Sequence, residues 1–208
     1  MTVDIARATD EARSVRKANA GEAERLATVL ARAFVDDPQM VWIFTDDARR
    51  LDFLQRGFAV FLRKLYLDHE ETYTTNSVAG ACIWEPPGTW KLGVADQLRL
   101  LPSMARIYRR LTPRVLRALM KLESNHPSEP HYYLPFVGVD PDWQGRGLGA
   151  ALMRPILDRC DDERMAAYLE ASSPRNRMLY ERHGFAVTEE FFLGPGSPPL
   201  WRMWRAPC

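Results

Sequence analysis

Residues 137–149, Val-Gly-Val-Asp-Pro-Asp-Trp-Gln-Gly-Arg-Gly-Leu-Gly, decide the fold of this chain. The first three are typical of the end of an apolar strand, and a helical pattern begins at Leu148. The glycines between them allow positive φ angles and a close approach of the backbone to a ligand. The first turn of a helix presents unpaired N–H groups at the positive end of its dipole. The stretch therefore predicts a phosphate site, and a cofactor that carries a pyrophosphate is the first hypothesis.

The composition is that of an ordinary globular domain. The chain has 208 residues, of which 46% are hydrophobic and 26% charged, and its formal net charge of +1 does not favour nucleic acid as a partner. No segment approaches the roughly 20 apolar residues that span a bilayer, so we expect no membrane association. Three cysteines without metal-ligand spacing favour reduced thiols in the cytoplasm: Cys82, Cys160 and Cys208.

Two parts are expected along the chain. Residues 1–13 are polar, lack the apolar run of a signal peptide, and predict a flexible tail. Residues 14–208 predict a single domain. Its strands are expected near 14–17, 71–75, 78–85, 131–139, 166–170, 186–193 and 200–205. Its helices are expected at 23–34, 48–67, 92–124 with interruptions at Pro102 and Pro113, 148–160, and 174–183. This order predicts an α/β (α+β) fold with a mixed, largely antiparallel sheet.

The glycine turn has two other interpretations. Gly145, Gly147 and Ala150 match a G-x-G-x-x-A fingerprint, and Glu170 lies 20 residues further on, as in dinucleotide-binding domains. Residues 140–144 separate the strand from the glycines, however, and too little chain follows for a second half of a doubly wound sheet. No G-K-[ST] sequence follows, so a nucleotide P-loop is not supported. A glycine turn without any ligand is the third interpretation.

Two sequence elements together resemble the GNAT superfamily of N-acetyltransferases. Residues 144–149 match its Q/R-x-x-G-x-G/A pattern, and residues 176–185 match its N-x-x-x-Y-x-x-x-G-F element at a fitting distance. Residues 129–205 are similar in particular to puromycin N-acetyltransferase, most specifically at 169–170, 173–176 and 180–182. The resemblance implies a GNAT-like twisted sheet flanked by helices with a splayed central strand pair. It also implies acetyl-CoA as cosubstrate, an amine as acceptor, and no metal.

The resemblance assigns the coenzyme site residue by residue. The pyrophosphate would bind the turn and the pantetheine arm would pair with the strand before it. The N–H of Val137 would face the acetyl carbonyl as an oxyanion donor. Pro135 lacks an N–H and is tolerated where a strand pair bulges and splays. The expected coenzyme-binding residues are Phe136, Val137, Val139, Gln144, Gly145, Arg146, Gly147, Leu148, Gly149, Asn176 and Tyr180.

Two residues are the candidates for proton transfer. Tyr180 is expected to protonate the departing thiolate, and a buried structural tyrosine is the alternative. Glu170 is expected to act as general base through water, and a salt-bridged surface carboxylate is the alternative. Some members of the superfamily place the acidic base near the position of Tyr133 here, which leaves the base open. His131 titrates in the useful range but is more often structural, and with His126 it makes no metal site.

The acceptor site is expected to be aromatic. Side chains that would line an apolar cavity are Phe34, Trp42, Phe44, Trp84, Tyr132 and Tyr133. Asp36 and Asp37 would attract a cationic amine or merely cap the turn at Pro38. Residues 97–121 carry seven basic residues and no acid, which indicates a solvated helix face or contact with an acidic partner.

These patterns predict a cytoplasmic N-acetyltransferase that moves acetyl from acetyl-CoA directly to a small-molecule amine, with aminonucleoside-like or antibiotic-like acceptors implied by the resemblance. A non-catalytic acyl-CoA-binding regulatory module is the alternative from another class. The expected partners include neither nucleic acid nor a membrane. Exposed sheet edges allow a homodimer.

Overall fold

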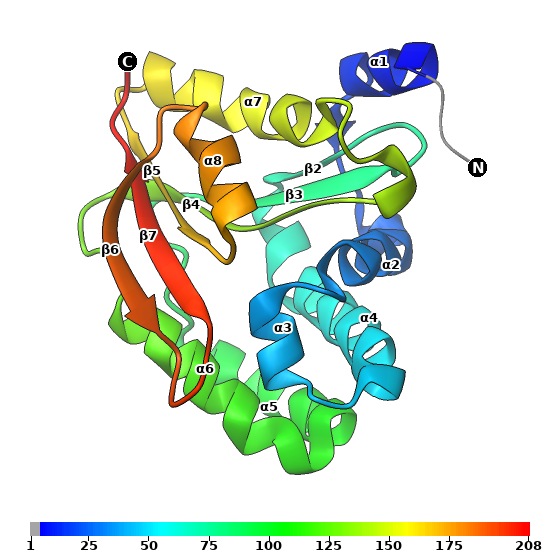
Figure 1. The fold of residues 1–208 in the computed structure, drawn as a ribbon, viewed down its shortest axis with the longest axis vertical. Helices are drawn as coiled ribbons and strands as arrows, with labels where there is room; N and C mark the ends of the chain where they lie inside the picture. Colours follow the sequence, from blue (N-terminus) through cyan, green and yellow to red (C-terminus); the bar gives the residue numbers. More distant parts are fainter. Residues whose placement is uncertain (1–4) are drawn as a thin grey trace.

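A twisted sheet runs through the computed structural model, which describes residues 5–208 (Figure 1). Within those residues the sheet has seven strands in the order β1-β2-β3-β4-β5-β7-β6. All neighbouring strands are antiparallel except the parallel pair β4 and β5. The prediction of a mixed, largely antiparallel sheet is therefore confirmed. The strands are β1 Arg16–Lys17, β2 Thr72–Thr74, β3 Gly80–Glu85, β4 His131–Val139, β5 Ala166–Ala171, β6 Ala186–Phe192 and β7 Pro199–Arg205.

Helices cover both faces of the sheet. In Figure 1, α2 to α6 gather on one side of the strands, and α7 and α8 lie on the other. The helices are α1 Ile5–Arg13, α2 Ala23–Phe34, α3 Pro38–Ile43, α4 Asp47–Lys64, α5 Val94–Tyr108, α6 Thr112–Ser124, α7 Leu148–Asp162 and α8 Pro174–Glu181.

Two hydrophobic cores result from the alternation of side chains along the strands. On β3, Ala81 and Ile83 point into a first core with α2, α4, α5 and α6. Cys82 and Trp84, which alternate with them along the strand, point into a second core with α7. All four are fully buried. The sheet therefore separates the molecule into two packed layers, and anything bound between β4 and β5 reaches both.

The parallel strands β4 and β5 pair only over part of their length. Their register runs from His131 opposite Ala166 to Leu134 opposite Leu169 and stops there. The next residue of β4 is Pro135, which has no N–H to donate to a ladder. On its other edge β4 stays paired with β3 as far as Val139. Residues 135–139 thus have one edge without a strand partner among the described residues, and the predicted splayed pair is present.

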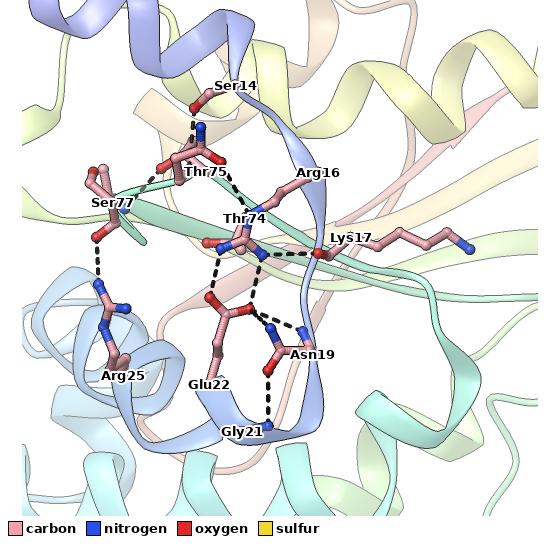
Figure 2. A network of polar contacts seen from close by, with 12 residues as sticks. Ser14, Arg16, Lys17, Asn19, Gly21, Glu22, Arg25, Thr74, Thr75 and Ser77 are labelled. Atoms are coloured by element: carbon pink, nitrogen blue, oxygen red, sulfur yellow. Dashed lines mark hydrogen bonds and ion pairs between the residues drawn. The ribbon is translucent and has the colours of Figure 1, made fainter.

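The chain enters the sheet through a polar anchor at β1 (Figure 2). Arg16 donates two hydrogen bonds to the carboxylate of Glu22, at 2.9 and 2.6 Å. Glu22 also accepts from the backbone N–H of Asn19, whose side chain accepts from Gly21 in a capping box. These bonds hold the start of α2 beside β1, and α2 then packs on the central strands.

Residues 5–13 do not form the expected tail. They form α1, which contacts α7, and Ala8 on its inner face is only 1% exposed. The guanidinium of Arg7 lies 5.1 Å from the ring centre of Trp143. The polar composition hid this helix because its buried face is narrow. The remainder of the expected tail, residues 1–4, lies outside the described residues.

The prediction that Pro102 interrupts the helical segment is wrong. It lies inside α5, on the exposed side, where the helix continues to Tyr108. The break comes at Arg109, which has a positive φ of 51°. Pro113 is in the first turn of α6, a position that suits its fixed φ.

The close packing of α2 on β4 is testable at Gly138. A Cβ there would lie 3.0 Å from both Ala33 Cβ and Leu30 Cδ2, so Gly138→Ala should cost about 1–3 kcal/mol of folding free energy through overpacking. Gly149→Ala is the control, because its nearest neighbour would be 3.8 Å away and alanine favours the helix. Urea unfolding measures the free energy of unfolding of both variants. Equal stabilities of Gly138→Ala and Gly149→Ala would contradict the close packing of α2 on β4.

Candidate active site

The glycine turn is open above its backbone. Gly145 and Gly147 have φ angles of 76° and 80°, and a Cβ at either would meet nothing within 4 Å. Gly147 is the N-cap of α7 and gives no side-chain cap to the helix. The first N–H groups of a helix have no partner within it, and those of α7 have no side-chain cap from Gly147, which suits an anion site.

Side-chain hydrogen bonds and ion pairs fix the conformation of the turn. Asp140 accepts from the N–H of Asp142, and Arg32 of α2 bridges both carboxylates at 2.8 and 3.2 Å. The Gln144 side chain donates to the carbonyl of Val139 at 3.0 Å. Arg146 folds back onto the turn and donates to the carbonyls of Asp142 and Gln144. The backbone is thus held in shape independently of any ligand.

A cavity of about 190 Å³ lies next to the gap between β4 and β5, on the side of the first core. Its walls are mostly apolar and come from α2, α3, α4, α5, α6 and the strands. Among its described lining residues the two carboxylates are Asp37 and Glu170. The lining includes Phe34, Met40, Ile43, Phe44, Phe58, Phe61, Tyr66, Tyr108, Leu119, Tyr133, Pro135, Phe136, Ser172 and Leu193.

Glu170 is a buried carboxylate held by two phenols. Its side chain is 6% exposed. It accepts hydrogen bonds from the hydroxyls of Tyr168 at 2.8 Å and Tyr133 at 2.9 Å. Burial raises the pKa of Glu170 to about 7, against the lowering effect of these bonds. A carboxylate with this pKa is suited to take a proton at neutral pH.

A second buried carboxyl, Glu85, lies one strand away and was missed by the sequence analysis. It is opposite Tyr133 in the register of β3 and β4 and is 3% exposed. Burial, and then the charge of Glu170, raise the pKa of Glu85 to about 8. The sequence could have indicated this buried carboxyl, because strand alternation puts Glu85 on the same face as Ala81 and Ile83.

Tyr180 lies on the last turn of α8 and is 8% exposed. Its ring packs edge-on against Phe185 at 6.1 Å. Burial raises the pKa of Tyr180, and proximity to Cys82 and Asp37 adds to the effect. The phenol therefore stays protonated at neutral pH. Asn176 is half-buried in the first turn of the same helix, where its N–H donates to Ser173.

Asp37 caps a helix and also lines the cavity. It caps α3 by accepting from the N–H groups of Gln39 and Met40, and it also faces the cavity. The Ser172 hydroxyl donates to its carboxylate in a short hydrogen bond. Burial raises the pKa of Asp37.

Three of the predicted acceptor residues do not line this cavity. Trp84 and Tyr132 belong to the second core, on the opposite face of the sheet, because they alternate with Ile83 and Tyr133 along their strands. Tyr132 donates to Glu163 there, at 3.0 Å. Trp42 lies outside the lining, beneath the guanidinium of Arg114 at 4.5 Å. The predictions of Phe34, Phe44 and Tyr133 as lining residues agree with the structure.

Phe136, expected at the coenzyme, points its side chain elsewhere. The ring packs between Phe34 at 5.6 Å and Phe58 at 5.0 Å and lines the cavity. The backbone of Phe136, like that of residues 137–139, lies at the edge of β4 that has no partner in β5. Val137 points to the second core, so the two faces of the gap are formed by alternate residues of β4.

The segment that carries the open turn, the splayed strands and the buried carboxyl of Glu170 is similar to known proteins. Residues 101–185 match the model of the acetyltransferase (GNAT) family. The chain is 25% identical to an uncharacterized N-acetyltransferase of Schizosaccharomyces pombe, over 93% of this chain and 83% of that protein. This chain is an acyltransferase whose residues 101–185 match the GNAT family.

Solved structures share the fold of this acyltransferase. The histone acetyltransferase HPA2 and related acetyltransferase from Corynebacterium glutamicum superposes with a TM-score of 0.71, at 23% identity, over 94% of this chain and 96% of that one. Arylalkylamine N-acetyltransferase 2 from Aedes aegypti superposes with a TM-score of 0.59, at 12% identity, over 92% and 97%. The dinucleotide interpretation is wrong, because a doubly wound sheet is parallel and this one has a single parallel pair within residues 5–208.

Members of the family use acetyl-CoA as cosubstrate, and the site has the features that such a ligand needs. The turn has open space above its backbone, and residues 135–139 have an edge without a partner in β5. Within the described residues no cluster of three or more His, Cys, Asp or Glu side chains is placed to hold a metal. None of the described helices has the length and apolar character needed to cross a membrane.

The buried carboxyl of Glu85 predicts a stability that depends on pH. Between its ordinary value of 4.5 and about 8, the folded protein keeps a proton on Glu85 that the unfolded chain has lost. The free energy of unfolding should therefore fall as pH rises through this window, by at most about 1.4 kcal/mol per pH unit. Glu85→Gln should be less sensitive to pH than the wild type.

Urea unfolding at pH 6 and pH 9 checks this, with Glu123→Gln, exposed on α6, as the control. An unchanged pH slope in Glu85→Gln would show that the carboxyl is solvated.

Proposed function

We propose that this enzyme transfers acetyl from acetyl-CoA directly to the amine of a small molecule. The observation that carries the proposal is the position of Glu170: a buried base in an apolar cavity, beside the gap where β4 and β5 separate. A buried base with a pKa near 7 is what amine deprotonation needs. The name of the S. pombe relative, an N-acetyltransferase, supports the same activity.

The coenzyme binds along the turn and the gap. The N–H groups of residues 145–149 hold the pyrophosphate, and the dipole of α7 favours its charge. The pantetheine arm pairs with the free edge of β4 at residues 136–139, as a peptide adds to a sheet. The thioester then lies between the cavity and the second core, with the N–H of Val137 toward its carbonyl oxygen. Asn176, at the start of α8, hydrogen-bonds the arm.

Two side chains move protons on the two sides of the thioester. Glu170 takes a proton from the acceptor ammonium, directly or through water, and the neutral amine attacks the acetyl carbon. The C–N bond forms, the tetrahedral adduct collapses, and the C–S bond breaks. Tyr180 gives its phenolic proton to the departing thiolate, for which its raised pKa keeps it protonated beforehand.

The acceptor has an amine at one end and a flat or apolar body. The phenyl and phenol rings of the cavity lie around the body, and Glu170 and Asp37 lie near the amine. The resemblance of residues 129–205 to puromycin N-acetyltransferase favours an aminonucleoside-like or antibiotic-like amine. Free cysteines at Cys82, Cys160 and Cys208 favour the cytoplasm, and the exposed edge of the sheet allows a homodimer.

Variants of the two proton-transferring residues separate an enzyme from a regulatory acyl-CoA binder. Tyr180→Phe should lower kcat by about 10²-fold and leave the Kd for acetyl-CoA unchanged, because the phenol acts on the leaving thiolate. In the wild type kcat/KM should rise with pH through about 7 as Glu170 ionises, and Glu170→Gln should lose this limb together with most of the rate.

Thiol release from acetyl-CoA with a panel of alkylamines, arylalkylamines and aminonucleosides measures kcat and the pH dependence of kcat/KM for each protein. Tyr73→Phe is the control, since its hydroxyl donates to Glu71 away from the gap. Binding of acetyl-CoA with no turnover for any amine would favour the non-catalytic alternative.

A further inference from the structure

Gln39 carries an unpaired polar atom in the wall of the cavity. It lies in the first turn of α3, is 3% exposed, and belongs to the lining of the cavity that also contains Glu170. Its side-chain Oε1 is buried and has no hydrogen-bond partner within the described residues. A buried amide oxygen without a partner costs folding free energy. In the wall of a binding cavity, such an atom is a candidate to accept a hydrogen bond from a ligand.

The nitrogen of the same amide shows which atom is left over. Nε2 of Gln39 donates to the carbonyl oxygens of Pro198 and Pro199, at 3.0 and 3.1 Å, where the chain enters β7. Turning the amide over would set Oε1 against these two oxygens, which only accept. The orientation of the amide is therefore fixed. Both of its N–H donors are used, and Oε1 remains as a free acceptor.

Hydrogen bonds also hold α3 against the strand that carries Glu170. The carboxylate of Asp37 accepts from the backbone N–H of Gln39 at 2.9 Å, and its other oxygen accepts from the hydroxyl of Ser172. Ser172 follows Glu170 by two residues, just beyond the end of β5. Gln39 thus keeps a fixed place relative to Glu170, on a different element of the same cavity.

The other described polar groups that α3 and the end of β5 bring to the cavity already have partners. Both carboxylate oxygens of Asp37 accept hydrogen bonds, and the hydroxyl of Ser172 donates to one of them. The remaining lining residues of α3 and of the β6 and β7 segments are apolar: Met40, Ile43, Leu193 and Leu200. A polar group on this part of an acceptor therefore has Oε1 of Gln39 as its unoccupied partner.

We propose that Oε1 of Gln39 selects acceptors that carry a hydrogen-bond donor, a hydroxyl or a second N–H, on the apolar body away from the reacting amine. The donor pairs with Oε1, whereas an analogue without it leaves the oxygen unpaired. A site built around a buried polar group discriminates strongly against analogues that lack the matching group. The inference rests on the proposed function and narrows its acceptors from apolar amines to hydroxy- or amino-substituted ones.

Matched acceptors test this selection in the wild-type enzyme. The three ring isomers of hydroxyphenethylamine are compared with phenethylamine, and amino alcohols of varied chain length with the corresponding alkylamines. For the best-placed hydroxyl, kcat/KM should be about three- to tenfold higher than for the analogue without it, as one hydrogen bond to a neutral partner provides. The methoxy counterpart of that acceptor should lose the advantage, because its oxygen cannot donate.

Gln39→Met removes the oxygen and keeps an unbranched side chain of similar length. The preference for the hydroxyl-bearing acceptor should vanish, because the hydroxyl then meets an apolar wall without a partner. The preference is a ratio between two acceptors measured on one protein, so a general loss of active enzyme does not change it. Met40→Leu is the matched control: it alters a neighbouring lining residue, leaves Oε1 in place, and should keep the preference.

Two results would overturn the proposal. One is a wild type that acetylates amines without preferring any hydroxyl-bearing member of a pair. The other is a preference that survives in Gln39→Met, or in Gln39→Leu if the methionine variant does not fold. Absence of turnover by the wild type with every amine would instead contradict the proposed function. Calorimetric binding of the same pairs, with and without the substitution, then decides the role of Gln39.

Discussion

The separation of β4 from β5 is the constraint on which the rest of the site depends. A parallel ladder satisfies the backbone of both strands, and this one stops after Leu134 because Pro135 has no N–H to continue it. From there β4 is held by β3 alone, and its other edge is available to a ligand. A coenzyme arm in this gap would lie between the two cores. It would thus bring the thioester to the cavity on one side and to α8 on the other.

Burial sets the electrostatics of the cavity. The helices that cover the first core remove water from Glu170 and Glu85. Ionising both carboxyls in one apolar layer costs much free energy. Tyr133 and Tyr168 compensate in part by donating to Glu170. The same enclosure keeps His126 neutral. One physical cause, the loss of solvent, therefore places a carboxyl that titrates near neutral pH, a second carboxyl that keeps its proton and a neutral imidazole close together.

Local sequence pattern was enough to predict the elements of the candidate coenzyme site. The apolar run before Asp140 and the glycines at 145 and 147 predicted β4, the turn and α7 because those signals are confined to adjacent residues. The lining of the cavity beside Glu170 could not be predicted in the same way. Trp84 and Tyr133 are equally aromatic, and only strand alternation with the pairing of β3 and β4 shows that they face opposite layers. Contacts between distant segments, such as that of His126 with Glu170, leave no local signal.

Hydrogen exchange with and without acetyl-CoA tests the separated strands most directly. Amides of residues 136–139 and 145–150 should exchange more slowly at saturating acetyl-CoA, because the free edge and the turn gain acceptors. Amides of residues 131–134, where β4 is already paired with β5, should be unchanged and serve as the internal reference. Protection of the turn without protection of 136–139, or no protection in either segment, would contradict a coenzyme arm paired with β4.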